Sequence, residues 1–190
     1  KMAAITPTDR PYLKKSVLEI WRSRIPWLLI LMISATFTGM IITYFEDALK
    51  TYVLLTAYIP MLMDTGGNSG SQASVTIIRG LSLNELEFRD LFRVVWKEFQ
   101  VAILAGVTLA IFNFAKLIII DQVGLMLSLV ICLTLMLTVF VAKLSGCALP
   151  MLAQKVGFDP AVMASPFITT IVDALSLLIY FRIATALLGL

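Results

Sequence analysis

Histidine is absent from this 190-residue sequence, and charged side chains make up only 14% of it. The first absence removes the commonest general base and metal ligand. The low charge content excludes an ordinary soluble domain, in which about 25% of the residues are charged. The two cysteines, Cys132 and Cys147, have no zinc-binding spacing, so a thiolate metal site is not expected. No basic tract is interleaved with aromatic residues, and we expect no nucleic-acid binding.

Apolar residues are what the sequence has in abundance: 59% of the chain is hydrophobic and the mean hydropathy is +0.94. These values predict an all-α, polytopic membrane protein in contact with lipid in the cell membrane. Five segments are apolar and long enough to cross a bilayer, and they lie at about 26–45, 51–78, 99–120, 123–142 and 161–181.

The N-terminal segment, residues 1–24, is polar and basic. Within it, Leu13, Val17 and Trp21 fall on one helical face, which predicts an interfacial amphipathic helix leading into the membrane. The first ten residues also fit a tag or linker remnant. We therefore divide the chain into this segment and a membrane domain of residues 25–190.

The basic residues are distributed unevenly between the expected connections. The segment before the first span, a 79–98 connection and a 143–159 loop hold 12 of the 15 Lys and Arg residues. The 79–98 connection contains a capping box at Ser82–Glu85, which predicts a surface helix. With five spans, the positive-inside rule places the N-terminus in the cytoplasm and the C-terminus outside.

The stretch 60–79 is unusually polar for a membrane span. On a helix, Asp64, Asn68 and Gln72 recur every four residues and share one face. Because an intramembrane carboxylate is costly, such a face usually lines a water-filled path or a polar bundle interior. Two structural alternatives stay open: Gly66 and Gly70 fit simple close helix packing, and Asn68 and Gln72 fit hydrogen bonding between helices.

The last span repeats this pattern. Ser165, Thr169, Asp173 and Ser176 recur at intervals of three or four residues. We infer that Asp64 and Asp173 face each other across one polar path, to which Thr170 adds a further hydroxyl. Oxygen ligands suit Mg²⁺, Ca²⁺ or Mn²⁺, and Mg²⁺ keeps most of its waters. A homodimer with the path on its two-fold axis would double the two carboxylates.

Two other functions use the same residues. A secondary carrier that exchanges or co-transports a divalent cation fits the polar path as a channel does. An intramembrane aspartyl protease would use two carboxylates, and Asp64-Thr65-Gly66 matches the soluble protease motif. The Gly-x-Gly-Asp string of the membrane proteases is missing around Asp173. We therefore expect a transport protein and not an enzyme.

The run from Pro60 to Gln72 and the later Asp159-Pro160-Ala161, Pro166, Thr169-Thr170 and Asp173 strongly resemble the transmembrane domain of the MgtE family of magnesium channels. This resemblance implies a homodimer of five-helix subunits that conducts Mg²⁺ into the cytoplasm through a central pore, lined by the second and fifth helices. It makes Asp173 the central magnesium-binding residue and places the Gly66-Gly67-Asn68 segment along the same pore.

Members of that family typically carry a cytoplasmic N-terminal domain and paired CBS domains that sense Mg²⁺. Nothing in these 190 residues resembles either. We therefore expect an isolated membrane domain or a natural short form, with such regulatory domains as possible partners. The predicted metal-binding residues are Asp173 and Asp64, and the predicted pore-lining residues are Asn68, Gly67, Gln72, Ser165, Thr169, Thr170 and Ser176.

Overall fold

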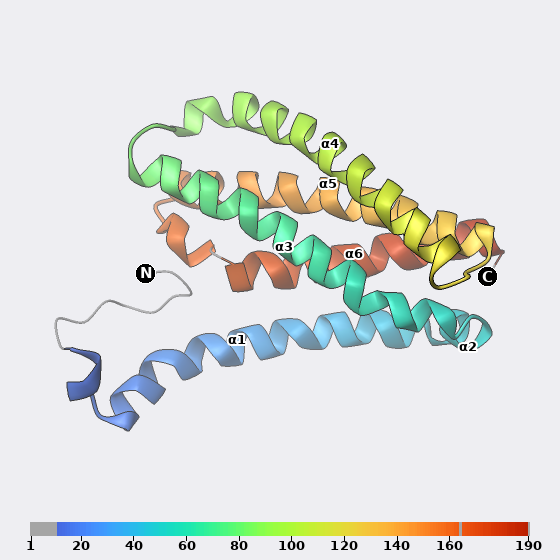
Figure 1. The fold of residues 1–190 in the computed structure, drawn as a ribbon. Helices are drawn as coiled ribbons and strands as arrows, with labels where there is room; N and C mark the ends of the chain where they lie inside the picture. The colour runs from blue at the N-terminus through green and yellow to red at the C-terminus, as the bar shows by residue number, and fades with distance from the viewer. Residues whose placement is uncertain (1–10, 164, 190) are drawn as a thin grey trace.

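The computed structural model describes residues 11–163 and 165–189, and the regular structure of this part of the chain is entirely helical (Figure 1). The α-helices are α1 (Val17–Tyr44), α2 (Glu46–Thr51), α3 (Leu54–Ser82), α4 (Leu91–Ile119), α5 (Leu125–Lys155) and α6 (Ser165–Leu188). Short 3₁₀ turns are η2 (Tyr12–Lys14), η3 (Phe88–Asp90) and η4 (Pro160–Met163). The all-α prediction is confirmed.

The N-terminal part of the chain forms one long helix. Ser16 caps α1 through a capping box with Glu19: the Glu19 N–H donates to Ser16 Oγ, and the Ser16 N–H donates to Glu19 Oε2. The helix then continues through Pro26 to Tyr44 without a break. Val17 and Trp21 of the predicted interfacial helix thus belong to α1, whereas Leu13 lies in the η2 turn, and the interfacial position of this segment stays a prediction. Residues 1–10 of the predicted segment lie outside the described residues.

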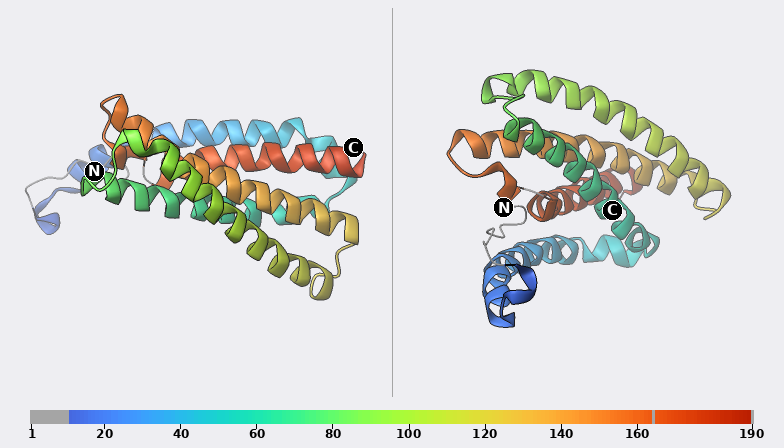
Figure 2. Two further views of the ribbon diagram at one scale, coloured as in Figure 1. Left: turned by 90° about the horizontal axis from the view of Figure 1, so that it is seen from above. Right: turned by 60° about the vertical axis from the view of Figure 1, so that its left-hand side comes forward.

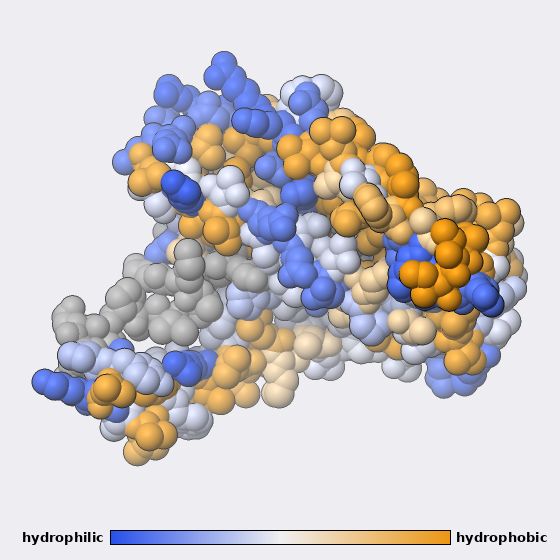
Figure 3. Space-filling model, in the orientation of Figure 1, coloured by the Kyte–Doolittle hydropathy of each residue, from blue (hydrophilic) through white to orange (hydrophobic). Residues whose placement is uncertain are grey.

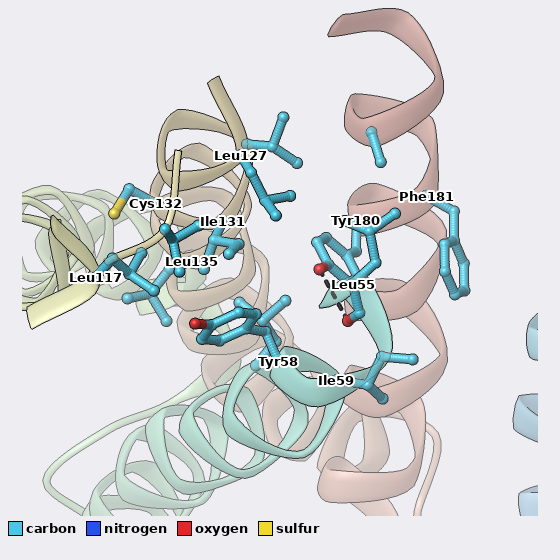
Figure 4. Packing of buried hydrophobic residues seen from close by; sticks show 14 of the residues in the cluster. Leu55, Tyr58, Ile59, Leu117, Leu127, Ile131, Cys132, Leu135, Tyr180 and Phe181 are labelled. Carbon is cyan, nitrogen blue, oxygen red and sulfur yellow. Dashed lines mark hydrogen bonds between the residues drawn. The ribbon is translucent and has the colours of Figure 1, made fainter. Parts of the chain in front are cut away.

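Helix α3 crosses one face of the bundle and packs on both α5 and α6 (Figures 1 and 2). Helix α4 packs along α5, whereas α1 packs mainly on α6 (Figure 2). The largest buried cluster joins α3, α5 and α6 through Leu55, Ile131 and Tyr180, each with 0% of its surface exposed (Figure 4). The two helices that carry the candidate carboxylates are thus held by one core.

The predicted loop at 143–159 is wrong over most of its length, because α5 continues to Lys155. Gly146 and Pro150 suggested a loop, but both are buried against neighbouring helices. A side chain added at Gly146 would overlap the carbonyl oxygen of Gly70, so the two helix backbones cross in direct contact here. This tertiary contact overrides the low helix propensity of glycine.

The surface helix predicted from Ser82 is also wrong at its start. Ser82 is the last residue of α3. The capping box in this connection is formed by Glu87 and Asp90, and α4 begins directly afterwards at Leu91. Helix α3 extends to Ser82 because Leu81, one residue earlier, is still buried and continues the apolar face of the helix.

The turn between α4 and α5 is tied to α3. Asp121 Oδ2 accepts hydrogen bonds from Lys116 Nζ at 2.7 Å and from the Tyr58 hydroxyl at 3.0 Å. The Lys116 bond lowers the pKa of the Asp121 carboxyl below its usual value. Gln122 in the same turn has a positive φ of 51°, and residues 120–124 connect the two helices.

Four helices in the described residues are long and apolar enough to cross a membrane by length and composition: α1, α4 with its preceding η3 turn, α5 and α6. These helices make the chain a multi-pass membrane protein. Helix α3 is of similar length but contains the polar stretch, which lowers its hydropathy. Figure 3 shows hydrophilic residues following α3 between hydrophobic surfaces. The assignment of α3 as a fifth membrane span stays a prediction.

Candidate ion site

Helix α3 has two different faces, which its sequence explains. One face consists of small residues and is buried against α5 and α6; it includes Gly66, Gly70 and Ala73. The opposite face is exposed and polar, with Asp64, Asn68, Gln72, Thr76 and Arg79 at intervals of three or four residues. The predicted helical periodicity is confirmed. The small residues bring α3 close to α6, and the polar residues stay accessible.

The glycines of α3 allow α6 to approach its backbone. A Cβ atom at Gly67 would lie 2.9 Å from Thr169 Cγ2, and one at Gly70 would lie 2.8 Å from Ile168 Cγ2. Real Cβ atoms do not reach such distances without displacing their neighbours. The glycines of α3 thus serve close helix packing, as the structural alternative predicted. The same packing positions Thr169 beside the polar face of α3.

A hollow of about 220 Å³ opens on the surface where α3 and α6 meet. It brings together both candidate carboxylates, from two helices more than 100 residues apart in the sequence. Its lining residues are Met63, Asp64, Gly67, Asn68, Thr169 and Asp173. The sequence-based inference that Asp64 and Asp173 border a common polar space agrees with this geometry.

The two carboxylates of the hollow have different surroundings. Asp64 is exposed, and its Oδ2 accepts a hydrogen bond from Asn68 Nδ2 at 3.1 Å. Asp173 is half-buried, and its Oδ1 is buried without a hydrogen-bond partner. Within the described residues neither carboxylate forms an ion pair with Lys or Arg within 4.0 Å. A buried carboxylate oxygen without a hydrogen-bond partner, such as Asp173 Oδ1, favours a ligand that supplies positive charge or hydrogen-bond donors.

Among the predicted pore-lining residues whose side chains the structure describes, Gln72, Thr170 and Ser176 do not line this hollow. Gln72 is exposed on the same face of α3, one turn beyond Asn68. Thr170 donates its hydroxyl to the Pro166 carbonyl at 2.9 Å, and the buried Ser176 donates to the Val172 carbonyl at 2.6 Å. Ser165 is the first residue of α6, and its side chain lies outside the described part of the structure.

The sequence reasoning did not include Met63, which lines the hollow beside Asp64. An apolar side chain gives no signal in a search for polar residues, although Met63 precedes Gly67 by one helical turn. In the part of the chain that the structure describes, no three His, Cys, Asp or Glu side chains cluster as a metal site. The described residues of one chain therefore bring two carboxylates, Asp64 and Asp173, to this hollow.

These features define the class of the protein: a multi-pass helical membrane protein with a carboxylate-lined hollow between two of its helices. Comparison with known proteins identifies the family. The MgtE family model, described as "Divalent cation transporter", matches residues 59–183. The chain belongs to the MgtE family. The matched region includes both α3 and α6 carboxylates.

The relatives support this assignment. The chain is 40% identical over 163 residues to "Magnesium transporter MgtE" of Bacillus subtilis (strain 168), covering 86% of this chain and 36% of the relative. It is 37% identical over 188 residues to the protein of the same name from Thermus thermophilus, covering 99% of this chain and 41% of the relative. The Enterococcus faecalis protein is 30% identical over 185 residues, covering 96% and 40%.

The chain therefore spans about two fifths of the length of the curated relatives that it matches. Those relatives are named as magnesium transporters. The resemblance to the MgtE family is confirmed. The predicted homodimer and the predicted regulatory partners stay predictions.

Proposed function

We propose that this chain forms the membrane part of a Mg²⁺ transporter, in which the hollow between α3 and α6 is one side of an ion path. The observation that carries the proposal is the presence of Asp64 and Asp173 in one hollow, with a buried Asp173 oxygen that has no hydrogen-bond partner. The names of the relatives support Mg²⁺ as the transported ion.

The chemistry of the lining fits a hydrated divalent cation. Mg²⁺ releases its waters reluctantly, so a path for it supplies charge and accepts hydrogen bonds from the ion's water shell. Asp173 and Asp64 supply the charge, while Asn68 and Thr169 offer further oxygen atoms beside them. Gln72 continues this surface along α3. Met63 adds an apolar side chain to the same lining.

A second copy completes the path in this proposal. Each chain supplies two carboxylates, and the polar face of α3 is exposed in the single chain. A polar face of this kind is unfavourable in lipid. A two-fold axis beside the hollow would cover it with the same face of another subunit and bring four carboxylates together. Helix α3 would then cross the membrane as the fifth span.

Five spans with the N-terminus in the cytoplasm follow from the distribution of basic residues. The extension of α5 to Lys155 places Lys155 at the end of the bundle at which α4 begins. An inside-negative potential contributes about 2.3 kcal/mol per charge per 100 mV to cation entry. This potential makes passive Mg²⁺ entry favourable without a coupled ion, as a channel requires.

Reconstitution of the chain in liposomes tests this function. We expect Mg²⁺ uptake, followed with an internal Mg²⁺-sensitive dye, to depend on an inside-negative potential and to increase with it. Planar-bilayer recording should give unitary currents above the turnover of a carrier. Mg²⁺ uptake without resolvable currents, and with strict dependence on a counter-ion, would replace the channel with a secondary carrier. Absence of uptake by a folded, inserted chain would contradict the proposal.

A further inference from the structure

A second hollow lies on the opposite side of α6, between α6 and α1. Its volume is about 420 Å³, within the range of about 300–1,000 Å³ typical of small-molecule pockets. Leu178 and Arg182 follow Asp173 by five and nine residues, and at 100° per residue they point away from the ion site. The residues that line this α1/α6 groove are Phe37, Met40, Ile41, Tyr44, Phe45, Leu178 and Arg182.

Arg182 is the charged residue of this groove. It is exposed, and within the described residues no carboxylate lies within 4.0 Å of its guanidinium group. The two carboxylates of the neighbouring helix α2 are occupied, because Lys50 Nζ lies 2.8 Å from Glu46 Oε1 and 3.8 Å from Asp47 Oδ1. The groove therefore combines an apolar wall with one uncompensated positive charge.

In a membrane that α1 and α6 span, the groove lies near the end of both helices, at the interface. Arg182 is six residues before the end of α6, about 9 Å along the helix axis. Tyr44 is the last residue of α1 and is 81% exposed, as is usual for tyrosines at the level of the headgroups. Phe37 and Met40 lie one to two turns deeper on α1, toward the middle of the bilayer.

We propose that the α1/α6 groove binds one anionic phospholipid. The guanidinium group of Arg182 binds the phosphate through two parallel hydrogen bonds. The Tyr44 hydroxyl lies at the same level and donates to the headgroup. One acyl chain follows the apolar wall formed by Phe37, Met40 and Leu178. This proposal requires only that α1 and α6 span the membrane, and it does not depend on the transported ion.

The charge of the groove favours a lipid over a second copy of the chain. A two-fold interface is made of the same surface on both subunits. Two copies meeting through this groove would bring a second Arg182 to the rim, and like charges would then face each other. An anionic headgroup instead neutralises the guanidinium group and leaves no polar atom of the lipid in the apolar part of the groove.

Native mass spectrometry of the chain, released from mixed vesicles of phosphatidylglycerol and phosphatidylcholine, tests the proposal. We expect one tightly retained phosphatidylglycerol per chain. Arg182→Gln should weaken this retention by at least about tenfold, the loss expected for a hydrogen bond to a charged group. Arg182→Lys should weaken it less, because the charge remains. Lys116→Gln is the matched control: it removes a charge that Asp121 already neutralises.

A second variant tests the apolar part of the groove. Met40→Trp fills the space of the acyl chain and should reduce retention of phosphatidylglycerol while the chain stays folded by circular dichroism. Equal retention of the two lipids by the unaltered chain would overturn the proposal. Unchanged retention in Arg182→Gln would also overturn it. If Met40→Trp converts a dimer to monomers and leaves the bound lipid unchanged, the proposal is wrong. The groove would then be a contact between two copies of the chain.

Discussion

The hydroxyl of Tyr180 donates a hydrogen bond to the carbonyl oxygen of Leu55, with 3.0 Å between the two oxygen atoms (Figure 4). The bond joins α6 to the first turn of α3. Pro60 lies within α3 and has no N–H to donate to the carbonyl of Thr56, the residue after Leu55. The tertiary bond thus supports a turn in which the helix has lost one hydrogen bond of its own.

Removal of this hydroxyl should destabilise the bundle without opening a large cavity. Tyr180 is fully buried, so we expect Tyr180→Phe to lower the free energy of unfolding by about 1 kcal/mol. Tyr12→Phe is the control, because Tyr12 is 63% exposed and its change should stay within about 0.5 kcal/mol. Equilibrium unfolding in mixed micelles measures both. Equal stability of the two variants would mean that water replaces the Tyr180 hydroxyl.

Asp173 should be essential for Mg²⁺ uptake. Asp173→Ala removes the carboxylate with the unpartnered buried oxygen, and we expect uptake into liposomes to be abolished with folding intact. Asp173→Asn retains an oxygen for the water shell of the ion and should keep partial conduction. Asp47→Asn, a change at a fully exposed carboxylate in α2, serves as the control for net charge. Uptake by the Ala variant at the unaltered rate would disprove the role of Asp173.

Asp64 should contribute to selectivity more than to folding. Its carboxylate is exposed and accepts a hydrogen bond from Asn68, an arrangement that Asn can imitate at no cost in buried charge. We expect Asp64→Asn to lower the preference for Mg²⁺ over K⁺ in liposome flux measurements, with normal expression. A variant with unchanged selectivity would instead assign Asp64 to hydrogen bonding on the surface of α3.

The crossing of α3 and α5 should tolerate no added methyl group. In Gly146→Ala the new Cβ would overlap the Gly70 carbonyl oxygen, which is backbone and cannot rotate away. Overpacking of this kind costs about 1–3 kcal/mol, and we expect a loss of stability in that range. Gly39→Ala is the matched control in α1, because nothing lies within 4 Å of its new methyl group. A stable Gly146→Ala variant would show that α5 can move away from α3.

A buried ion pair should hold α4 against α5. Lys143 Nζ lies 3.9 Å from Glu98 Oε2, and the two side chains are only 8% and 16% exposed. Glu98→Ala leaves Lys143 uncompensated and should cost about 3–5 kcal/mol, whereas the double change Glu98→Leu with Lys143→Leu should recover most of that loss. Thermal unfolding of the unaltered chain and of the two variants measures this recovery. A double variant no more stable than Glu98→Ala would mean that the loss does not come from the uncompensated Lys143 charge.

Much of this architecture follows from the sequence. The apolar runs predicted the long helices, and the four-residue spacing placed Asp64 and Asn68 on the exposed face of α3. The extension of α5 could not be predicted in this way. Gly146 and Pro150 have low helix propensity, and the contact that compensates for it is made by Gly70, 76 positions earlier in the chain.

The sequence also could not predict which polar residues of α6 line the hollow, and the cause is again tertiary packing. Periodicity placed Ser176 on the same side of α6 as Asp173, but three residues correspond to a rotation of 300°. That rotation turns Ser176 toward the buried side, where its Oγ would lie 3.1 Å from a Cβ at Gly66. Helical spacing gives a face to within about a quarter turn, and only the packing of α3 on α6 decides which members of that face are accessible.

The direct contact of α6 with the glycines of α3 has one more consequence. Thr169 and Ile168 rest on the main chain of α3 at Gly67 and Gly70, with no intervening side chain to deform. The relative height of Asp64 and Asp173 is therefore set by backbone-to-side-chain contact, and displacement of α6 by one residue would shift it by about 1.5 Å. The offset between the two carboxylates along the helix axes is thus fixed by steric fit and changes only if one helix slides along the other.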